Sequence, residues 1–362
     1  MLIPFYQPSL NGNEKKYVNE CLDTTWISSR GRFVREFEDK FAEYIGVRHA
    51  TSVCNGSVAL HLALLALDIQ PEDEIIVPTL TYIASVNAIS HAGATPVFVD
   101  SLHSTWQLDP ADVRKKITDK TRAIMAVHLY GHPCEMDELV RICREHDLLL
   151  IEDCAEAFGT YYNNQHVGTF GDIATYSFFG NKTLTTGEGG MVVTQHESLY
   201  ERAASIKNQG VSQSLQYWHD HIGYNYRMTN ICSALGVAQL ECVGNVLQKK
   251  RHIAELYREG LNILPVMLHD EVGNVRHSYW MSSILLNDEK HRDPLRKHLE
   301  DCHIETRPLF FPAHLMKMYQ KAGEQHLVAE SLSSRGINLP SWPDLREEQI
   351  HYIMKCIREY AW

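Results

Sequence analysis

The sequence predicts an α/β fold: a large domain in which helices flank a mostly parallel, mixed sheet, followed by a smaller C-terminal α+β domain. Apolar strand patterns alternate with helical patterns along the first part of the chain, which is typical of parallel βαβ units with right-handed crossovers. The strand patterns cover residues 74–78, 96–100, 122–128 and 148–153, and the helical patterns between them cover 110–117 and 135–145. Near Leu264 this alternation gives way to shorter mixed elements. We therefore expect a large domain with its N-terminal segment over residues 1–245 and a small domain over 246–362.

The other elements follow from apolar periodicity. Phe33, Phe37, Phe41 and Tyr44 recur at helical spacing and predict a helix face. Further helices are expected at 197–207, 229–240, 245–261 and 292–300, and further strands at 191–194 and 278–286. The helix that begins at 229 is expected to be capped at its start by a Thr or Asn side chain. The basic cluster at 249–251 is expected to lie on a solvated helix face.

Composition is that of a soluble globular protein, with 44% hydrophobic and 22% charged residues in a chain of 362. A net charge of -11 argues against a general nucleic-acid binder, because neutralising phosphates requires basic surface. Nine cysteines without a C-x-x-C pair predict reduced thiols in the cytoplasm. No apolar run approaches the roughly 18 residues that span a bilayer. Metal-ligand spacing is also missing, and His219 and His221 fit an exposed polar turn better than a metal site.

One carboxylate and one lysine form a candidate catalytic pair. Residues 148–151 are apolar and are followed at once by Glu152 and Asp153, which places Asp153 at the ligand-binding end of a buried parallel strand. Lys182 follows the strand pattern 176–179 and precedes glycines that cannot continue a helix, so it lies on a constrained loop. An enzyme that uses pyridoxal 5'-phosphate (PLP) needs such a pair: the lysine binds the cofactor's aldehyde, and the acid keeps the ring nitrogen protonated. Taken singly, the two residues also fit a solvated strand end and a surface loop.

The residues around this pair resemble the sugar-nucleotide aminotransferases of fold type I. The lysine motif of that family, Ser-Phe-x-x-Asn-Lys followed by Gly-Glu-Gly-Gly, stands here at residues 177–182 and 187–190. The resemblance extends from Pro8 to the Trp-Pro pair at 342–343 and implies a fold-type I PLP aminotransferase that works as a homodimer with shared active sites. Related enzymes that remove a 3-hydroxyl from a keto-deoxy sugar carry histidine in place of the lysine. Lys182 therefore favours transamination over dehydration.

The resemblance also implies the residues that hold the cofactor, namely Gly56, Ser57, Tyr82, Asp153, Glu156, Ser177, Lys182 and Asn225. Gly56 and Ser57 open a helix directly after a strand, where free backbone N–H groups and the helix dipole favour a phosphate, although an ordinary helix cap is an alternative. Tyr82 is expected to stack on the pyridine ring rather than to be a core aromatic. Asn225 belongs to a Gly-x-Asn-x-Arg-Met element that would reach into the partner's site, and Arg227 in that element also fits an ordinary ion pair.

For the substrates, the resemblance implies L-glutamate as the amino donor and a GDP-linked keto sugar, GDP-4-keto-6-deoxy-D-mannose, as the acceptor in bacterial O-antigen and lipopolysaccharide synthesis. The substrate-contact residues implied by the resemblance are Trp26, Ser28, Arg307, Phe311 and His314. The segment 26–31 also fits a linker with a buried aromatic anchor, and Arg307 fits either a bidentate clamp for an anion or a structural role.

Three rival functions remain open at the level of the sequence. The first is an aminotransferase for a dTDP- or UDP-linked keto-deoxy sugar. The second is a Rossmann-type dehydrogenase, which requires G-x-G-x-x-G at the start of a helix; no such run exists, and the glycines at 187–190 precede a strand. The third is a binding or regulatory protein with the same fold, which would have no use for Lys182 together with Asp153.

Overall fold

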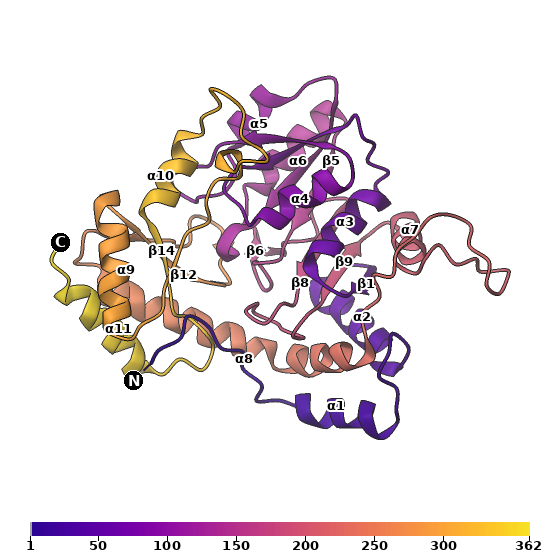
Figure 1. Cartoon of the computed structure of the whole chain (residues 1–362), viewed down its shortest axis with the longest axis horizontal. Coiled ribbons are helices and arrows are strands. Elements are labelled where there is room, and N and C mark those ends of the chain that lie inside the picture. Colours follow the sequence, from indigo (N-terminus) through magenta and orange to yellow (C-terminus); the bar gives the residue numbers. More distant parts are fainter. Residues whose placement is uncertain (1) are drawn as a thin grey trace.

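The first part of the chain forms a central sheet in this computed structural model, which describes residues 2–362 (Figure 1). Its strands are β1 (His49–Val53), β2 (Glu74–Pro78), β3 (Thr95–Val99), β4 (Thr121–Val127), β5 (Leu149–Asp153), β8 (Ile173–Ser177) and β9 (Gly190–Thr194). They lie in the order β1-β9-β8-β5-β4-β2-β3. Neighbours from β8 to β3 pair in parallel, whereas β9 is antiparallel to both β8 and β1. The predicted mixed, mostly parallel sheet is therefore confirmed.

Both faces of this sheet are buried, which explains why its strands are continuous apolar runs. On β2, Ile75 and Val77 pack with α3 (Gly56–Ala66) and α4 (Ile83–His91), whereas Ile76 packs on the other face with α5 (Pro110–Lys116) and α6 (Met136–His146). The remaining helices of this part are α1 (Glu14–Asp23), α2 (Arg32–Ile45), the 3-10 helix η1 (Leu129–Gly131) and α7 (Glu197–Lys207). The predicted alternation of strands and helices thus builds a layered α/β structure.

Helix α2 anchors the segment that carries Lys182. Its buried residues Phe33, Phe37 and Phe41 follow the predicted helical spacing. The ring centroids of Phe37 and Phe41 lie 5.2 and 5.4 Å from that of Phe178, which directly follows β8. Aromatic packing of this kind fixes the point at which the lysine loop leaves the sheet.

The C-terminal part has its own sheet and core. Its strands are β10 (Val266–Leu268), β12 (Ser282–Leu286), β13 (Arg307–Pro308) and β14 (Gly336–Leu339), in the order β10-β12-β14-β13. Its helices are η2 (Glu289–His291), α9 (Arg292–Asp301), η3 (Ala313–Leu315), α10 (Leu327–Arg335) and α11 (Glu347–Glu359). The strand predicted over 278–286 is shorter than expected: β12 begins only at Ser282, and residues 278–281 lie outside this sheet. The N-terminus lies beside this part (Figure 1), and buried Ile3 pairs with Ile304 in its core.

A small third sheet and one long helix connect the two parts. β11 (Val275–Arg276) pairs with β6 (Tyr161–Tyr162), which pairs with β7 (Gln165–His166). The helix α8 (Asn230–Leu261) runs continuously for 32 residues along both parts (Figure 1). Two separate helices were expected here, so that prediction was wrong: packing of α8 on α1, α2 and α11 carries the helix through Gly244. The proposed division at 245/246 lies inside α8 and stays a prediction.

Two expectations about α8 had different outcomes. The predicted cap at its start is confirmed, since Thr229 Oγ1 accepts a hydrogen bond from the Cys232 N–H at 3.3 Å. The predicted solvated face at 249–251 is wrong for Lys250, which is fully buried; its Nζ donates to the Ser341 carbonyl at 2.7 Å. The covering segment is about ninety residues away along the chain, so helical periodicity alone could not reveal this burial. Among residues 2–362, no helix has the length and apolar character to cross a membrane.

Replacing Lys250 with methionine is expected to stabilise the protein by about 1–3 kcal/mol near pH 7. Burial lowers the pKa of the Lys250 amine from 10.5 to about 7, so the unfolded chain binds a proton that the folded chain holds poorly. The gain should be largest near or below pH 7 and should vanish as the pH approaches 10.5. Chemical denaturation at several pH values measures it. Lys249→Met, at the neighbouring partly exposed position that pairs with Asp344, is the control and should not stabilise the protein; a destabilised Lys250→Met would contradict the prediction.

Candidate active site

Loops from four strands meet at the carboxyl-end edge of the central sheet. Because parallel strands end at the same edge, residues far apart in the sequence come together there. These loops carry Gly56 after β1, Tyr82 after β2, Glu156 after β5 and Lys182 after β8. The sequence-predicted pair lies at this edge: Asp153 is the last residue of β5, and Lys182 follows the neighbouring strand β8.

The Lys182 amine lies in a largely buried position. Its side chain is 12% exposed, and its Nζ lies 3.5 Å from Glu156 Oε1. The loop that carries it is fixed by hydrogen bonds from the Lys182 N–H to the Phe179 carbonyl at 2.9 Å and from the Tyr6 hydroxyl to the Lys182 carbonyl at 3.0 Å. Burial lowers the pKa of the Lys182 amine, and Glu156 and then Asp153 oppose that effect. Burial also raises the pKa of Glu156 to about 7.

Asp153 is held rigidly but keeps capacity to accept further hydrogen bonds. Its Oδ2 accepts from Ser85 Oγ at 2.7 Å, and its Oδ1 accepts from the Ala155 N–H at 3.0 Å. Only 4% of the residue is exposed. Each carboxylate oxygen has a second lone pair, so a cationic N–H could bind here without breaking either contact. This is the chemistry that a protonated pyridine nitrogen requires.

The start of α3 forms a cradle suited to an anion. Asn55 caps this helix through its Oδ1, which accepts from the Val58 N–H at 3.0 Å, and the first N–H groups of the helix have no partner within it. A Cβ atom added to Gly56 would lie 2.6 Å from the Cβ of Ser177, so Gly56 lies directly against another predicted cofactor-binding residue. Ser57 is exposed beside them. Together with Lys182 and Asp153, this cradle fits the phosphate, aldehyde and ring nitrogen of PLP.

Gly56→Ala is expected to weaken PLP binding about ten- to a hundredfold. The added methyl group would collide with Ser177 and push the start of α3 away from the end of β8. Titrating the apo-enzyme with PLP and following absorbance gives the dissociation constant. Gly244→Ala is the matched control, because a Cβ at Gly244 meets nothing within 4 Å; equal affinities for the two variants would refute the expectation.

An aromatic cavity of about 460 Å³ opens beside this edge. It is lined by Phe5, Thr81, Tyr82, Ile83, Asn181, Trp280, Met281, Arg307, Pro308, Leu309, Phe310, Phe311, Met316 and Asn338. Tyr82 and Phe311 are 55% and 54% exposed, so their rings remain available to a ligand. Arg307 pairs with Glu305 at 2.5 Å, and its guanidinium lies 5.3 Å from the Phe5 ring centroid. Three of the predicted ligand contacts, Tyr82, Arg307 and Phe311, thus share one cavity.

The other predicted substrate residues lie in different surroundings. His314 is buried, with Nδ1 2.7 Å from Thr79 Oγ1 and Nε2 3.1 Å from Glu330 Oε1, so both ring nitrogens are already engaged. Trp26 and Ser28 lie against the start of α8. The Asn230 side chain donates to the Trp26 carbonyl, and the Asn230 backbone N–H donates to the Ser28 carbonyl. Both are exposed within one chain, and their contact with substrate stays a prediction.

Asn225 lies on the segment between α7 and α8, part of which projects from the molecule (Figure 1). Its Oδ1 accepts a hydrogen bond from Arg227 Nε at 2.9 Å, and Arg227 Nη1 donates to Asn208 Oδ1 at 3.1 Å. These amide contacts, rather than an ion pair, orient Arg227. The projecting segment exposes 90% of Tyr217 and 89% of Ile222. Apolar side chains this exposed are typical of a surface that another chain covers.

No sequence pattern indicated a role for Trp280, which lies against the lysine. Lys182 Nζ is 3.8 Å from the centroid of the Trp280 ring, and Trp280 Nε1 donates to the Asn181 carbonyl at 2.7 Å. The pattern of residues 278–286 predicts one strand, so periodicity could not indicate that Trp280 lies outside the sheet.

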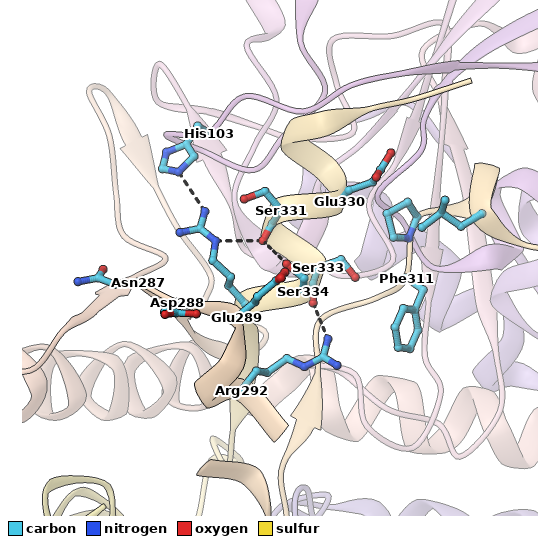
Figure 2. A pocket seen from close by; sticks show the side chains of 13 residues that line it. His103, Asn287, Asp288, Glu289, Arg292, Phe311, Glu330, Ser331, Ser333 and Ser334 are labelled. Atoms are coloured by element: carbon cyan, nitrogen blue, oxygen red, sulfur yellow. Dashed lines mark hydrogen bonds between the residues drawn. The ribbon is translucent and has the colours of Figure 1, made fainter. Parts of the chain in front are cut away.

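A second cavity, of about 860 Å³, lies elsewhere, beside α10 (Figure 2). Its lining carboxylates, Asp288, Glu289 and Glu330, outnumber its arginines, Arg292 and Arg335. Figure 2 shows Arg292 bonded to α10, through the Ser333 carbonyl. Arg335, the last residue of α10, donates to the Ser331 carbonyl and lies 3.4 Å from His103 Nε2. This charge balance does not favour a diphosphate.

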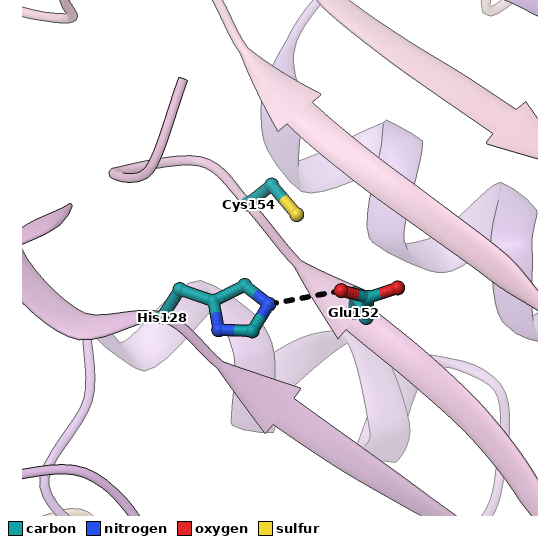
Figure 3. A group of neighbouring side chains, drawn as sticks. All are labelled: His128, Glu152 and Cys154. Atoms are coloured by element: carbon teal, nitrogen blue, oxygen red, sulfur yellow. Dashed lines mark hydrogen bonds and ion pairs between the residues drawn. The ribbon is translucent and has the colours of Figure 1, made fainter. Parts of the chain in front are cut away.

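One buried group of candidate metal ligands occurs within residues 2–362: His128, Glu152 and Cys154, whose ligand atoms lie within 4.8 Å of one another (Figure 3). His128 Nε2 is 3.1 Å from Glu152 Oε2, and the Glu152 carboxylate also accepts three backbone N–H groups, from Gly168, Phe170 and Gly171. His128 Nδ1 accepts from the Cys134 N–H. His128 and Glu152 are therefore engaged in a buried hydrogen-bond network. Side chains alternate along a strand, so Glu152 serves this network while Asp153 faces the candidate site.

Comparisons with known proteins agree with this geometry. The model of the DegT/DnrJ/EryC1/StrS aminotransferase family matches residues 8–358. GDP-perosamine synthase of Escherichia coli O157:H7 is 59% identical over 358 residues, covering 99% of this chain and 98% of that protein, and GDP-perosamine synthase of Vibrio cholerae is 52% identical over 363 residues, covering 99% of both. Among solved structures, Spr1654 of Streptococcus pneumoniae in its PLP form superposes with a TM-score of 0.94 at 26% identity, covering 99% of this chain and 98% of that one. The chain therefore belongs to the DegT/DnrJ/EryC1/StrS aminotransferase family, and its cofactor is PLP.

Proposed function

We propose that this enzyme transfers the amino group of L-glutamate to C4 of GDP-4-keto-6-deoxy-D-mannose, giving GDP-perosamine and 2-oxoglutarate for bacterial O-antigen synthesis. The observation that carries the chemistry is the buried Lys182 amine, 3.5 Å from Glu156, at the same sheet edge as Asp153. The choice of sugar is supported by the two GDP-perosamine synthases that match nearly the whole chain.

Lys182 has two roles in this proposal. Its amine holds the cofactor's aldehyde when no substrate is bound, and it becomes a free base once the amino donor has displaced it. When bound, PLP withdraws electrons from the donor's α-carbon and so makes the proton there acidic. Lys182 Nζ takes that proton and later delivers it. Burial lowers the pKa of the Lys182 amine, which favours the neutral form that a base requires.

Asp153 and the start of α3 hold the two ends of the cofactor. Asp153 keeps a proton on the ring nitrogen through charge, and its contacts with Ser85 and Ala155 fix its direction. Gly56, Ser57 and Ser177 would bind the phosphate, and Tyr82 would cover one face of the ring. Glu156 is close enough to the lysine to contact the cofactor where it joins Lys182.

The active unit is proposed to be a homodimer in which Asn225 binds the cofactor phosphate of the neighbouring subunit. The exposed apolar side chains beside Asn225 support this assembly, because a second copy would cover them. The nine unpaired cysteines support a reducing, cytoplasmic setting for the reaction.

The direct test of the sugar is product analysis with purified enzyme, L-glutamate and a panel of GDP-, dTDP- and UDP-linked keto sugars. We expect amination of the GDP-linked 4-keto sugar alone. Turnover confined to a dTDP- or UDP-linked sugar would establish the rival aminotransferase instead, and would leave the roles of Lys182 and Asp153 intact.

The shared site can be tested by mixing two impaired variants, Lys182→Ala and Asn225→Ala. If Asn225 serves the partner's site, a mixed dimer contains one site with both defects and one with neither. Random subunit exchange should then restore about a quarter of wild-type activity. Without restoration in demonstrably mixed dimers, Asn225 would have to act within its own subunit.

A further inference from the structure

We propose that Trp280 is a positioning residue for Lys182: the face of its indole ring receives the lysine amine in its charged form, just after that amine has taken the proton from the amino donor. In this step the α-carbon C–H bond breaks and a new N–H bond forms at Nζ. The electron pair stays on the carbon side, so the nitrogen gains one positive charge. The inference rests on the proposed role of Lys182 and adds a residue to it.

The geometry around Nζ supports this role. The amine lies 3.8 Å from the Trp280 ring centroid, well within the roughly 6 Å over which an aromatic face attracts a cation. Glu156 Oε1 is 3.5 Å from Nζ, and Asp153 is the other acid that favours its charged form. Because Trp280 is 4% exposed, water competes little for the ammonium group. The charged amine therefore has an aromatic face and a carboxylate as its nearest charge-stabilising groups.

Trp280 is held on both of its sides. Its Nε1 donates to the carbonyl of Asn181, the residue before the lysine, at 2.7 Å. The ring stacks on that of Tyr130, with centroids 6.1 Å apart and planes 11° from parallel. The Tyr130 N–H in turn donates to Glu156 Oε2 at 2.9 Å. One residue thus connects the aromatic face to the carboxylate that the amine also approaches.

The backbone beside Tyr130 is built for this close approach. Gly131 has a φ of +99°, and a Cβ there would lie 2.5 Å from Ser278 Oγ and 3.0 Å from the Trp280 backbone nitrogen. Only glycine tolerates both the left-handed backbone and the lack of space. Residues 278–281 lie outside β12, although the sequence predicted a strand there. Trp280 can therefore place its ring against the Lys182 amine.

If Trp280 only filled space, another apolar side chain would replace it equally well. The two explanations differ in what they predict for Trp280→Leu and Trp280→Phe. Leucine keeps the site apolar but has no aromatic face, whereas phenylalanine keeps the face and loses the hydrogen bond to Asn181. Trp342→Phe is the control, because Trp342 is equally buried but lies in the C-terminal core.

The first experiment labels Lys182 with cyanate in the apo-enzyme, from about pH 6 to about pH 10, and measures carbamylation of its peptide by mass spectrometry. The pH midpoint reports the proton affinity of the amine. Wild type, Trp280→Phe and Trp342→Phe should share one midpoint, and Trp280→Leu should shift it down by about 0.5–1 in pH. Equal midpoints for Trp280→Leu and Trp280→Phe would overturn the proposal.

The second experiment follows the glutamate half-reaction of the holoenzyme. Trp280→Leu should lower kcat about three- to tenfold more than Trp280→Phe does, with the KM for glutamate nearly unchanged. An equal loss in both variants, or a loss confined to KM, would assign Trp280 a structural or binding role only. Neither experiment uses a sugar nucleotide, so a wrong choice of sugar would not affect the result. Should Trp280→Leu not fold, Trp280→Met offers the same comparison without an aromatic face.

Discussion

Lys182→Ala is expected to reduce turnover by at least about ten thousandfold, because one amine performs both the covalent and the acid–base work. The variant should also lose the visible absorbance of the lysine–cofactor bond. PLP should still bind, because the start of α3, Ser177 and Asp153 are unaffected, but its affinity should be lower without that bond. Absorbance spectra and assays of the glutamate half-reaction, recorded on the same preparations, measure both effects.

The control for this experiment is Lys249→Ala, which removes a partly exposed lysine paired with Asp344. Its spectrum and turnover should match wild type. A Lys182→Ala protein that kept the lysine–cofactor absorbance would show that a different amine holds the cofactor. The buried Lys250 would then be the next residue to replace.

Asp153→Asn is expected to reduce turnover about a hundred- to a thousandfold. Asparagine has nearly the same shape and can keep its contacts with Ser85 and the Ala155 N–H, but it cannot hold the ring nitrogen protonated through charge. The loss should fall mainly on kcat, because the missing charge acts where electrons flow into the ring. Steady-state kinetics of the half-reaction with glutamate measures this effect.

Ser85→Ala provides the comparison for Asp153. It removes one hydrogen bond to the carboxylate but leaves the negative charge, so we expect a loss of about tenfold or less. The order of the two variants is the decisive result. If Ser85→Ala were as damaging as Asp153→Asn, the orientation of the carboxylate rather than its charge would be the important property.

Much of the fold followed from local rules. The apolar runs of the central sheet, the helical spacing of Phe33, Phe37 and Phe41, and the Thr229 cap are all set by residues within a few positions of one another. The candidate pair was visible for the same reason: Asp153 ends a buried strand, and Lys182 stands in a motif with glycines close by. Where the resemblance to a family was strong, it also indicated the cofactor.

Other predictions failed because distant segments decided the outcome. The helix break expected before residue 245 is overridden by packing of α8 against three other helices. Lys250 is buried by residues near 341 rather than by its own helix. Glu152 and Asp153 looked equivalent in the sequence, but the alternation of the strand sends the first into the network with His128 and the second to the active-site edge.

The sequence by itself determined the α/β class, the alternating strands and helices of the large domain, and the lysine and carboxylate on which the chemistry depends, because each is encoded by neighbours along the chain. Only the tertiary structure decided which aromatic ring faces the lysine, which acid lies beside it and which charged side chains are buried. Those outcomes depend on contacts between residues such as Lys182 and Trp280, which are about a hundred positions apart and follow no local pattern.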